Sequence, residues 1–84
     1  MPDQQNNYLI ICQTPKQAVQ LFKDAVSYCL DQSISIVRAS QCTLSIFTRD
    51  RSVRFVSEER AERAIIGFHG KVRMAWEFEN KNVF

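Results

Sequence analysis

Apolar residues recur along this chain with the spacing of β-strands in five segments. The first segment, residues 8–12, is a continuous apolar run rich in strand-forming residues, which is typical of a strand covered on both faces of a sheet. Residues 34–39, 43–48 and 52–57 are shorter segments with alternating apolar positions. We expect each of them to form a strand, the last two being joined by the tight connection Arg49-Asp50-Arg51.

The fifth segment, residues 72–79, has the most regular alternation. Its apolar residues Val72, Met74, Trp76 and Phe78 alternate with Arg73, Ala75, Glu77 and Glu79. This pattern predicts a half-buried strand with one solvated face. On that face Glu77 and Glu79 would lie about 7 Å apart.

The longest helical pattern follows the first strand. Thr14 is suited to cap a helix, Pro15 to occupy its first position, and Gln17 to complete a capping box. We therefore expect a helix over residues 15–30. Its buried face would consist of Ala18, Phe22, Ala25, Val26 and Cys29.

A second helix is predicted after the fourth strand. Ser57 is a candidate cap, and Glu58 and Glu59 in the first turn favour the helix dipole. Gly67 or Gly70 would end this helix. The buried side would be formed by Ala61, Ala64, Ile65 and Phe68.

The resulting order is β-α-β-β-β-α-β. It predicts an α+β fold, or a small α/β fold, in which two helices pack on a mixed sheet. Residues 1–84 would form a single domain. The termini, residues 1–7 and 80–84, are expected to be flexible, with docking of Phe84 on the domain as the alternative.

The net charge of +2 does not identify a partner, but its distribution is uneven. Residues 35–84 hold nine basic and six acidic groups, and eight of the nine lie between Arg38 and Arg73. This clustering raises the chance of an anionic partner. No apolar run approaches the roughly 20 residues of a membrane span. The polar N-terminus lacks a signal pattern, so we expect a cytoplasmic protein with no membrane partner.

The sequence offers no constellation for catalysis. It has two glycines, both near residue 70, and no phosphate-binding loop. The three cysteines form no CxxC, and the only histidine, His69, has no cysteine near it in sequence. We therefore expect no enzyme activity, no cofactor and no metal site. A remnant nuclease or ATPase site at Glu77 and Glu79 ranks last among the alternatives.

Three segments carry a resemblance that covers residues 8–79. The segments are YLIICQTPKQAVQLF, SIFTRDRSVRFVS and ERAIIG, followed by the closing strand with its acidic residues. Together they resemble the middle of the ATPase domain of phage large terminases. The resemblance implies the element order given above and a phage or mobile-element association. It implies no activity, because the phosphate loop is absent, Trp76 replaces the metal-binding Asp, and Ile66 replaces the usual Arg.

A shorter segment, Ile65-Ile66-Gly67-Phe68-His69-Gly70-Lys71, resembles the IIGxxG loop of KH domains. In that family the loop clamps a nucleic-acid backbone between two helices. The alternation after Lys71 favours a strand there instead. A glycine that stops the preceding helix is the simpler interpretation.

The remaining functional candidate is a basic surface around the connection between the third and fourth strands. Arginine forks suit phosphates, and Phe47 is a candidate stacking platform. A solvated charged face and a core role for Phe47 are the more common explanations of such patterns. The candidate nucleic-acid-binding residues are Arg38, Arg49, Arg51, Arg54, Lys71 and Arg73.

The leading hypothesis from the sequence is a small non-enzymatic binding protein that contacts another protein or itself. A free edge strand would provide such a contact surface, and a homodimer would enlarge a modest core. The alternative is a DNA- or RNA-binding module that uses the basic hairpin over residues 49–54. Affinity for an oligonucleotide at low salt would distinguish the two hypotheses.

Overall fold

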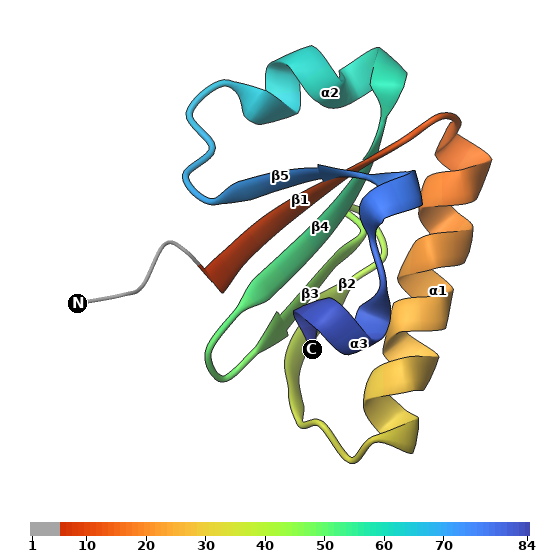
Figure 1. Ribbon diagram of the computed structural model, residues 1–84, viewed down its shortest axis with the longest axis vertical. Helices are drawn as coiled ribbons and strands as arrows, with labels where there is room; N and C mark the ends of the chain where they lie inside the picture. Colours follow the sequence, from red (N-terminus) through yellow and green to blue (C-terminus); the bar gives the residue numbers. More distant parts are fainter. Residues whose placement is uncertain (1–5) are drawn as a thin grey trace.

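The fold is built around one mixed sheet of five strands, as a computed structural model that describes residues 6–84 shows (Figure 1). The strands are β1 (Asn7–Cys12), β2 (Ile36–Ser40), β3 (Ser45–Thr48), β4 (Ser52–Ser57) and β5 (Lys71–Met74). Their order in the sheet is β2-β3-β4-β1-β5. β1 runs parallel to both β4 and β5, whereas β2, β3 and β4 form an antiparallel meander. The predicted α+β class with a mixed sheet is thereby confirmed.

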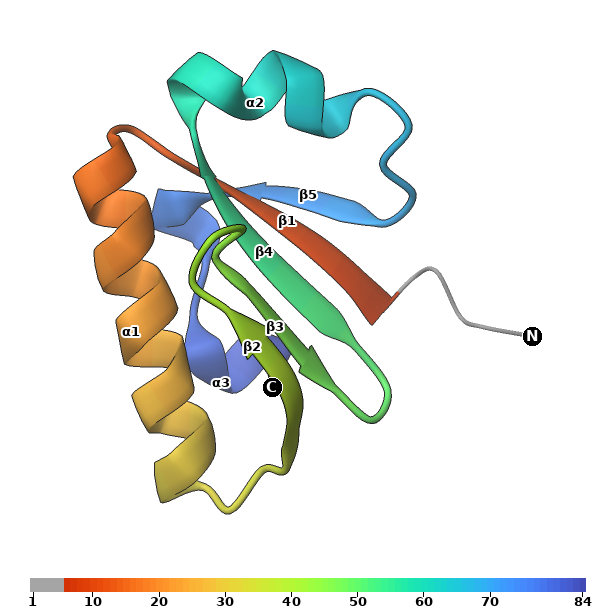
Figure 2. The ribbon, with the colours of Figure 1, turned by 180° about the vertical axis from the view of Figure 1, so that it is seen from behind.

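Helices cover the two faces of this sheet. They are α1 (Pro15–Asp31), α2 (Glu58–Ile65) and the short C-terminal α3 (Asn80–Val83), and a 3-10 turn, η2, spans Ala75–Glu77. α1 and α3 lie on one face and α2 on the other, as the two opposite views show (Figures 1 and 2). Among residues 6–84 no helix is long and apolar enough to cross a bilayer.

The position of β1 explains its unbroken apolar run. It has a strand on each side, and its side chains alternate between two cores. The core under α1 contains Ile10, Cys12, Ala18, Phe22, Ala25, Ile46, Val53, Phe55 and Val83. The core under α2 is smaller and contains Leu9, Ile11, Val56 and Ala61. From Leu9 to Cys12 both faces of β1 are therefore removed from water.

The predicted start of α1 is confirmed by its hydrogen bonds. The Thr14 hydroxyl accepts a bond from the backbone N–H of Gln17 at 3.1 Å. The Gln17 side chain accepts a bond from the backbone N–H of Gln13 at 2.7 Å, one residue before the cap. The first bond satisfies a donor that the first turn of the helix leaves free. The second goes to Gln13 and not to the Thr14 N–H, so the predicted capping box is not closed. The two bonds fix the direction in which the chain leaves β1.

α2 departs from its prediction at both ends. Ser57 stands at the cap position, but its hydroxyl makes no cap hydrogen bond. The helix ends at Ile65, which is exposed and not buried as predicted. Gly67 follows with a φ of 75°, in the left-handed region that favours glycine. A Cβ at Gly70 would lie 2.3 Å from the Asn7 carbonyl oxygen, so only glycine fits where the chain enters β5.

The prediction of a strand over residues 72–79 is wrong beyond Met74. β5 ends there, and the next three residues form η2, in which Trp76 is 71% exposed. The reason is that the chain turns so that Phe78 packs edge-to-face on Phe55, with ring centroids 5.4 Å apart. Glu77 and Glu79 therefore do not form a carboxylate pair on a strand.

The C-terminal segment covers part of the sheet that α1 leaves open. Val83 of α3 is buried in the core under α1, and the Phe84 ring packs on Tyr28 with centroids 6.4 Å apart. The structure thus agrees with the alternative prediction, in which Phe84 docks on the domain, and not with a flexible segment over residues 80–84. At the other terminus, the expectation of flexibility falls mainly on residues 1–5, which lie outside the described residues.

The second and third strands begin two residues later than predicted, at Ile36 and Ser45. Ile34 instead closes the end of α1, its backbone N–H donating to the Cys29 carbonyl at 2.8 Å. Leu44 has a φ of 51°, a conformation that no strand continues through. Both boundaries are therefore set by turn geometry that the apolar pattern does not contain.

Candidate nucleic-acid interface

The structure separates the six basic residues that the sequence singles out. Arg38 and Arg54 lie on the side of the sheet that faces α2, because Arg54 pairs with Leu9 of the core under α2. Lys71 and Arg73 pair with Tyr8 and Ile10 of the other core, so they face the side of α1. The remaining two, Arg49 and Arg51, belong to the turn between β3 and β4.

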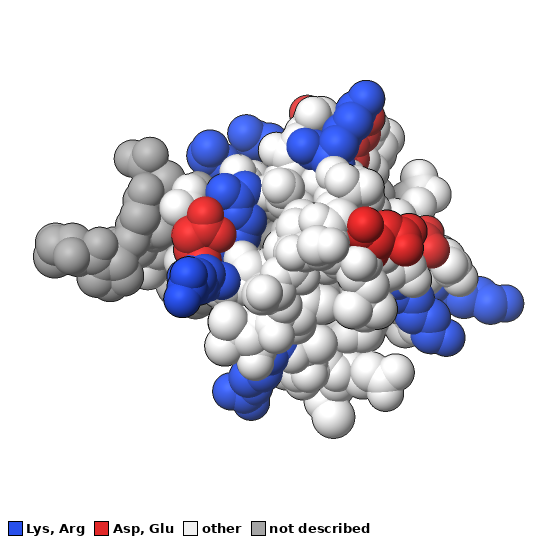
Figure 3. All heavy atoms as spheres, turned by 90° about the horizontal axis from the view of Figure 1, so that it is seen from below, with Lys and Arg blue, Asp and Glu red and all other residues white. Residues whose placement is uncertain are grey.

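Arg51 has a structural role in that turn. Its guanidinium donates a hydrogen bond to the Val83 carbonyl oxygen and lies 3.3 Å from the Asp50 carboxylate. The hydrogen bond from Arg51 is the main cause that lowers the pKa of Asp50 below its ordinary value. Arg49 is exposed. Seen from this end of the molecule, basic side chains are spread around the rim and interspersed with acidic ones (Figure 3).

Lys71 and Arg73 are held along the edge of the sheet. The Lys71 ammonium lies 5.6 Å from the centroid of the Tyr8 ring, a cation–π distance. The Arg73 guanidinium donates to the carbonyl oxygen of its neighbour Val72 at 3.1 Å. They do not join Arg38 and Arg54, because the sheet stands between the two pairs.

The α2 side of the sheet is covered over only half of its width. α2 packs on β1 and the end of β4, where Leu9, Ile11 and Val56 lie. Beyond them, toward β3 and β2, the register places Arg38 opposite Phe47 on adjacent strands. The Phe47 side chain is 39% exposed, and Arg38 and Arg54 are exposed on either side of it. β4 places Ser52 opposite Phe47 and Arg54 opposite Ser45. This half of the sheet therefore presents an aromatic ring with Arg38 directly across on β2 and Arg54 diagonally across on β4.

α2 adds two further arginines at the border of this surface. Arg60 and Arg63 are three residues apart and lie on the same side of the helix, where they line a hollow with Arg54 and Ala64. Glu58 and Glu62 fall on the opposite side by the helical repeat. Among residues 6–84 the ion pairs are Arg51–Asp50 and Lys81–Glu79, and neither involves these arginines. We call Arg38, Phe47, Arg54, Arg60 and Arg63 the arginine face.

Sequence reasoning missed Arg60 and Arg63. Their i, i+3 spacing on a helix with acidic residues on its other side was a usable signal. What the sequence lacked was the strand order. Only the placement of β4 beside β1 brings Arg54 to the same side of α2 as Arg60 and Arg63.

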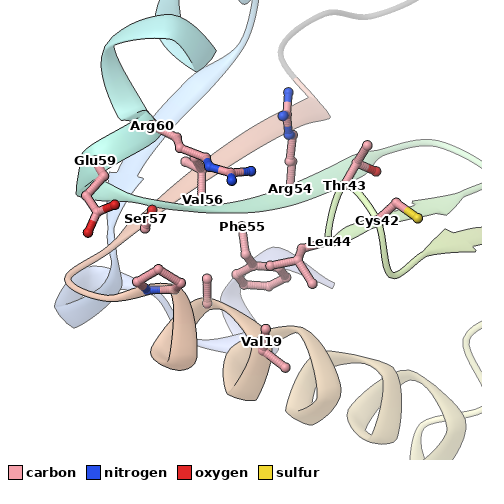
Figure 4. Close-up of a pocket in the computed structure, with 12 residues that line it drawn as sticks. Val19, Cys42, Thr43, Leu44, Arg54, Phe55, Val56, Ser57, Glu59 and Arg60 are labelled. Atoms are coloured by element: carbon pink, nitrogen blue, oxygen red, sulfur yellow. The ribbon is translucent and has the colours of Figure 1, made fainter.

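A crevice adjoins the arginine face at the carboxyl end of β4, between the segment before β3 and the first turns of α1 and α2 (Figure 4). β1 continues into α1 on one face of the sheet and β4 into α2 on the other. Residues 7–12 of β1 do not line the crevice, which lies on the β3 side of β4 and not in the gap between β1 and β4. The volume of the crevice is about 210 Å³. It is lined by Pro15, Ala18, Val19, Cys42, Thr43, Leu44, Arg54, Phe55, Val56, Ser57, Glu59 and Arg60.

The groups that serve as nucleophiles or metal ligands are dispersed. Burial raises the pKa of the Cys12 thiol to about 11, so this thiol is neutral near pH 7. Burial also raises the pKa of Cys29. His69 is exposed in the loop before β5. Over residues 6–84 no group of three His, Cys, Asp or Glu side chains is arranged to hold a metal ion. The chemistry concentrated at this site is that of cations and hydrogen-bond donors.

Comparison of the chain with protein-family models, with curated protein sequences and with solved structures gives no match. The site must therefore be interpreted from its own geometry.

Proposed function

We propose that this protein binds single-stranded nucleic acid on the arginine face and catalyses no reaction there. The observation that carries the proposal is the partly exposed Phe47 ring, with Arg38 opposite it on β2 and Arg54 diagonal to it on β4, on a part of the sheet that residues 6–84 leave uncovered. Guanidinium groups recognise phosphates with paired hydrogen bonds, and an exposed ring stacks on a base. The two kinds of contact lie on adjacent β-strands. This arrangement suits a single-stranded nucleic acid, in which bases and phosphates alternate.

The exposed ring of Phe47 favours a single strand over a duplex. In a duplex the base faces are stacked on each other and are inaccessible to Phe47, whereas an unpaired base offers its whole face. Arg60 and Arg63 extend the line of positive charge from the sheet onto α2. We infer a path for the nucleic-acid backbone from β2 across β4 to α2. A cytoplasmic location, expected from the sequence, agrees with such a ligand.

The test is the binding of a fluorescently labelled single-stranded oligonucleotide to the purified chain. We expect saturable binding at low salt, which weakens as salt is raised because bound phosphates release counterions. A duplex of the same sequence should bind more weakly. If the single strand does not bind at low salt, the proposal is wrong.

A second candidate, docking of another protein, rests on a different surface. Among residues 6–84 β5 is an edge strand with no partner strand on its outer side, and the exposed side chains of Trp76 and Ile66 (71% and 79%) lie beyond its two ends. Pairing of β5 with a second copy would bring the Lys71 and Arg73 charges of both copies together. A partner strand with acidic residues avoids that repulsion, so it is preferred over self-association.

This second candidate has its own test. A soluble peptide of alternating valine and glutamate should change the amide chemical shifts of residues 71–74 and the fluorescence of Trp76. If neither signal changes, β5 is not a docking edge for such a strand. Sedimentation of the chain alone checks for self-association.

A further inference from the structure

The crevice contains a buried hydroxyl that the fold does not use. Ser57 is only 4% exposed, it lines the crevice, and it makes no cap hydrogen bond to α2. No other hydrogen bond of its side chain is found among residues 6–84. Among residues 6–84 the fully buried side-chain atom without a partner is Asn80 Oδ1 and not the Ser57 oxygen, which remains accessible from the crevice. The hydroxyl is therefore free to donate to a ligand in the crevice.

Backbone donors gather at the same place. The first amides of α2 have no acceptor within the helix, and the positive end of the helix dipole lies there. The last bond between β4 and the segment before β3 runs from the Phe55 N–H to the Leu44 carbonyl, at 3.0 Å. Alternation along the strand directs the Ser57 N–H to the same side, where β3 has not yet begun. Oriented amides at a helix start are a common anion site.

Two guanidinium groups border this set of donors. Arg54 and Arg60 line both the crevice and the hollow of the arginine face. In the close-up the Arg60 side chain extends over β4 toward Arg54, while the Glu59 carboxylate lies on the side of Ser57 (Figure 4). The donors of Ser57 therefore have the carboxylates of the first turn of α2, Glu58 and Glu59, near them as well as the two arginines. Glu59 reduces the net attraction but does not lie between the two arginines.

We propose that the crevice binds the terminal phosphate of the nucleic-acid strand that lies on the arginine face. A chain end fits better than an internal phosphate, because Pro15, Ala18 and Phe55 line the crevice and a continuous strand would have to leave past them. Ala18, Val19 and Leu44 provide an apolar wall for the terminal sugar. A terminal phosphate also carries more charge and more free oxygens than an internal one. This inference rests on the proposed function.

The experiment compares three oligonucleotides of one sequence, with a 5′-phosphate, a 3′-phosphate or no terminal phosphate. One of the phosphorylated strands should bind about tenfold more tightly than the unphosphorylated strand, as two additional charge-assisted hydrogen bonds would give. In Ser57→Ala that preference should fall several-fold, while the affinity for the unphosphorylated strand stays the same. Ser27→Ala, at an exposed position on α1, is the matched control and should keep the preference.

The outcomes separate this inference from the proposed function. Equal affinities for the three strands would overturn the phosphate site and leave the arginine face standing. A preference that survives Ser57→Ala would also overturn the site. Inorganic phosphate gives a test without a variant: it should shift the amide resonances of Glu58, Glu59 and Arg60. Such shifts without any oligonucleotide binding would support an anion site and reject the proposed function, and their absence would count against the site.

Discussion

The Arg51 guanidinium donates a hydrogen bond to the backbone carbonyl oxygen of Val83, 32 residues away along the chain. This contact joins the turn between β3 and β4 to the C-terminal helix α3. The sequence assigned Arg51 to the candidate nucleic-acid-binding surface, but this contact gives Arg51 a structural role instead. The contact also explains how the short helix α3 is held on the sheet.

Replacement of Arg51 should therefore affect stability. We expect Arg51→Ala to lower the free energy of unfolding by about 1–2 kcal/mol, the usual range for a hydrogen bond from a charged group. Urea denaturation measures this change. Arg49→Ala is the control in the same turn, since Arg49 is exposed and makes no ion pair within residues 6–84. Equal stability of the two variants would mean that the bond to Val83 contributes nothing.

Truncation of Val83 tests the docking of α3 from the other side of the contact. Val83→Ala removes the equivalent of two buried methylene groups from the core under α1 and should cost about 2 kcal/mol. Val37→Ala changes the same atoms on the exposed strand β2 and should be close to neutral. A flexible C-terminal segment would instead make both substitutions neutral.

The Asp50–Arg51 pair gives a prediction for pH. The folded-state pKa of Asp50 lies below the ordinary value of 3.8, so its contribution to stability is present above that pH. It is lost as the pH falls through the lower, folded-state pKa. The stability advantage of the wild type over Asp50→Asn should accordingly shrink in that range and stay constant at neutral pH. Denaturation midpoints at a series of pH values would reveal parallel curves if the pair has no such effect.

Phe47 is the aromatic residue on which the proposed stacking depends. Phe47→Ala should weaken oligonucleotide binding by about 1–3 kcal/mol, the range for loss of one base–aromatic stack. Trp76→Ala is the matched control, because Trp76 is a more exposed aromatic residue outside the arginine face. Fluorescence titration of both variants at one salt concentration provides the comparison. A larger loss with Trp76→Ala would place the ligand elsewhere.

Much of the fold follows from local features of the sequence. The unbroken run of β1 and the cap of α1 at Thr14 each contain enough information to place their element. The end of β5 does not, because the alternation of Trp76 and Phe78 is that of a strand. What turns the chain after Met74 is the packing of Phe78 on Phe55, a contact between distant segments.

The candidate site was less predictable than the fold for a similar reason. The sequence identified Arg38 and Arg54 but combined them with Lys71 and Arg73, which lie on the other side of the sheet. The side that each strand presents depends on the register and order of the strands, and the sequence does not state them. Arg60 joins Arg54 only because β4 lies next to β1 and its connection to β5 passes through α2.

The salt dependence of oligonucleotide binding tests the central claim most directly. If the four arginines of the arginine face contact phosphates, the logarithm of the affinity should fall with the logarithm of salt concentration with a slope of about −3. Replacing Arg60 and Arg63 by Gln should roughly halve that slope. Replacing Lys16 and Lys23 of α1 by Gln removes the same charge from another surface and should leave the slope nearly unchanged. Equal slopes for the two double variants would contradict the account.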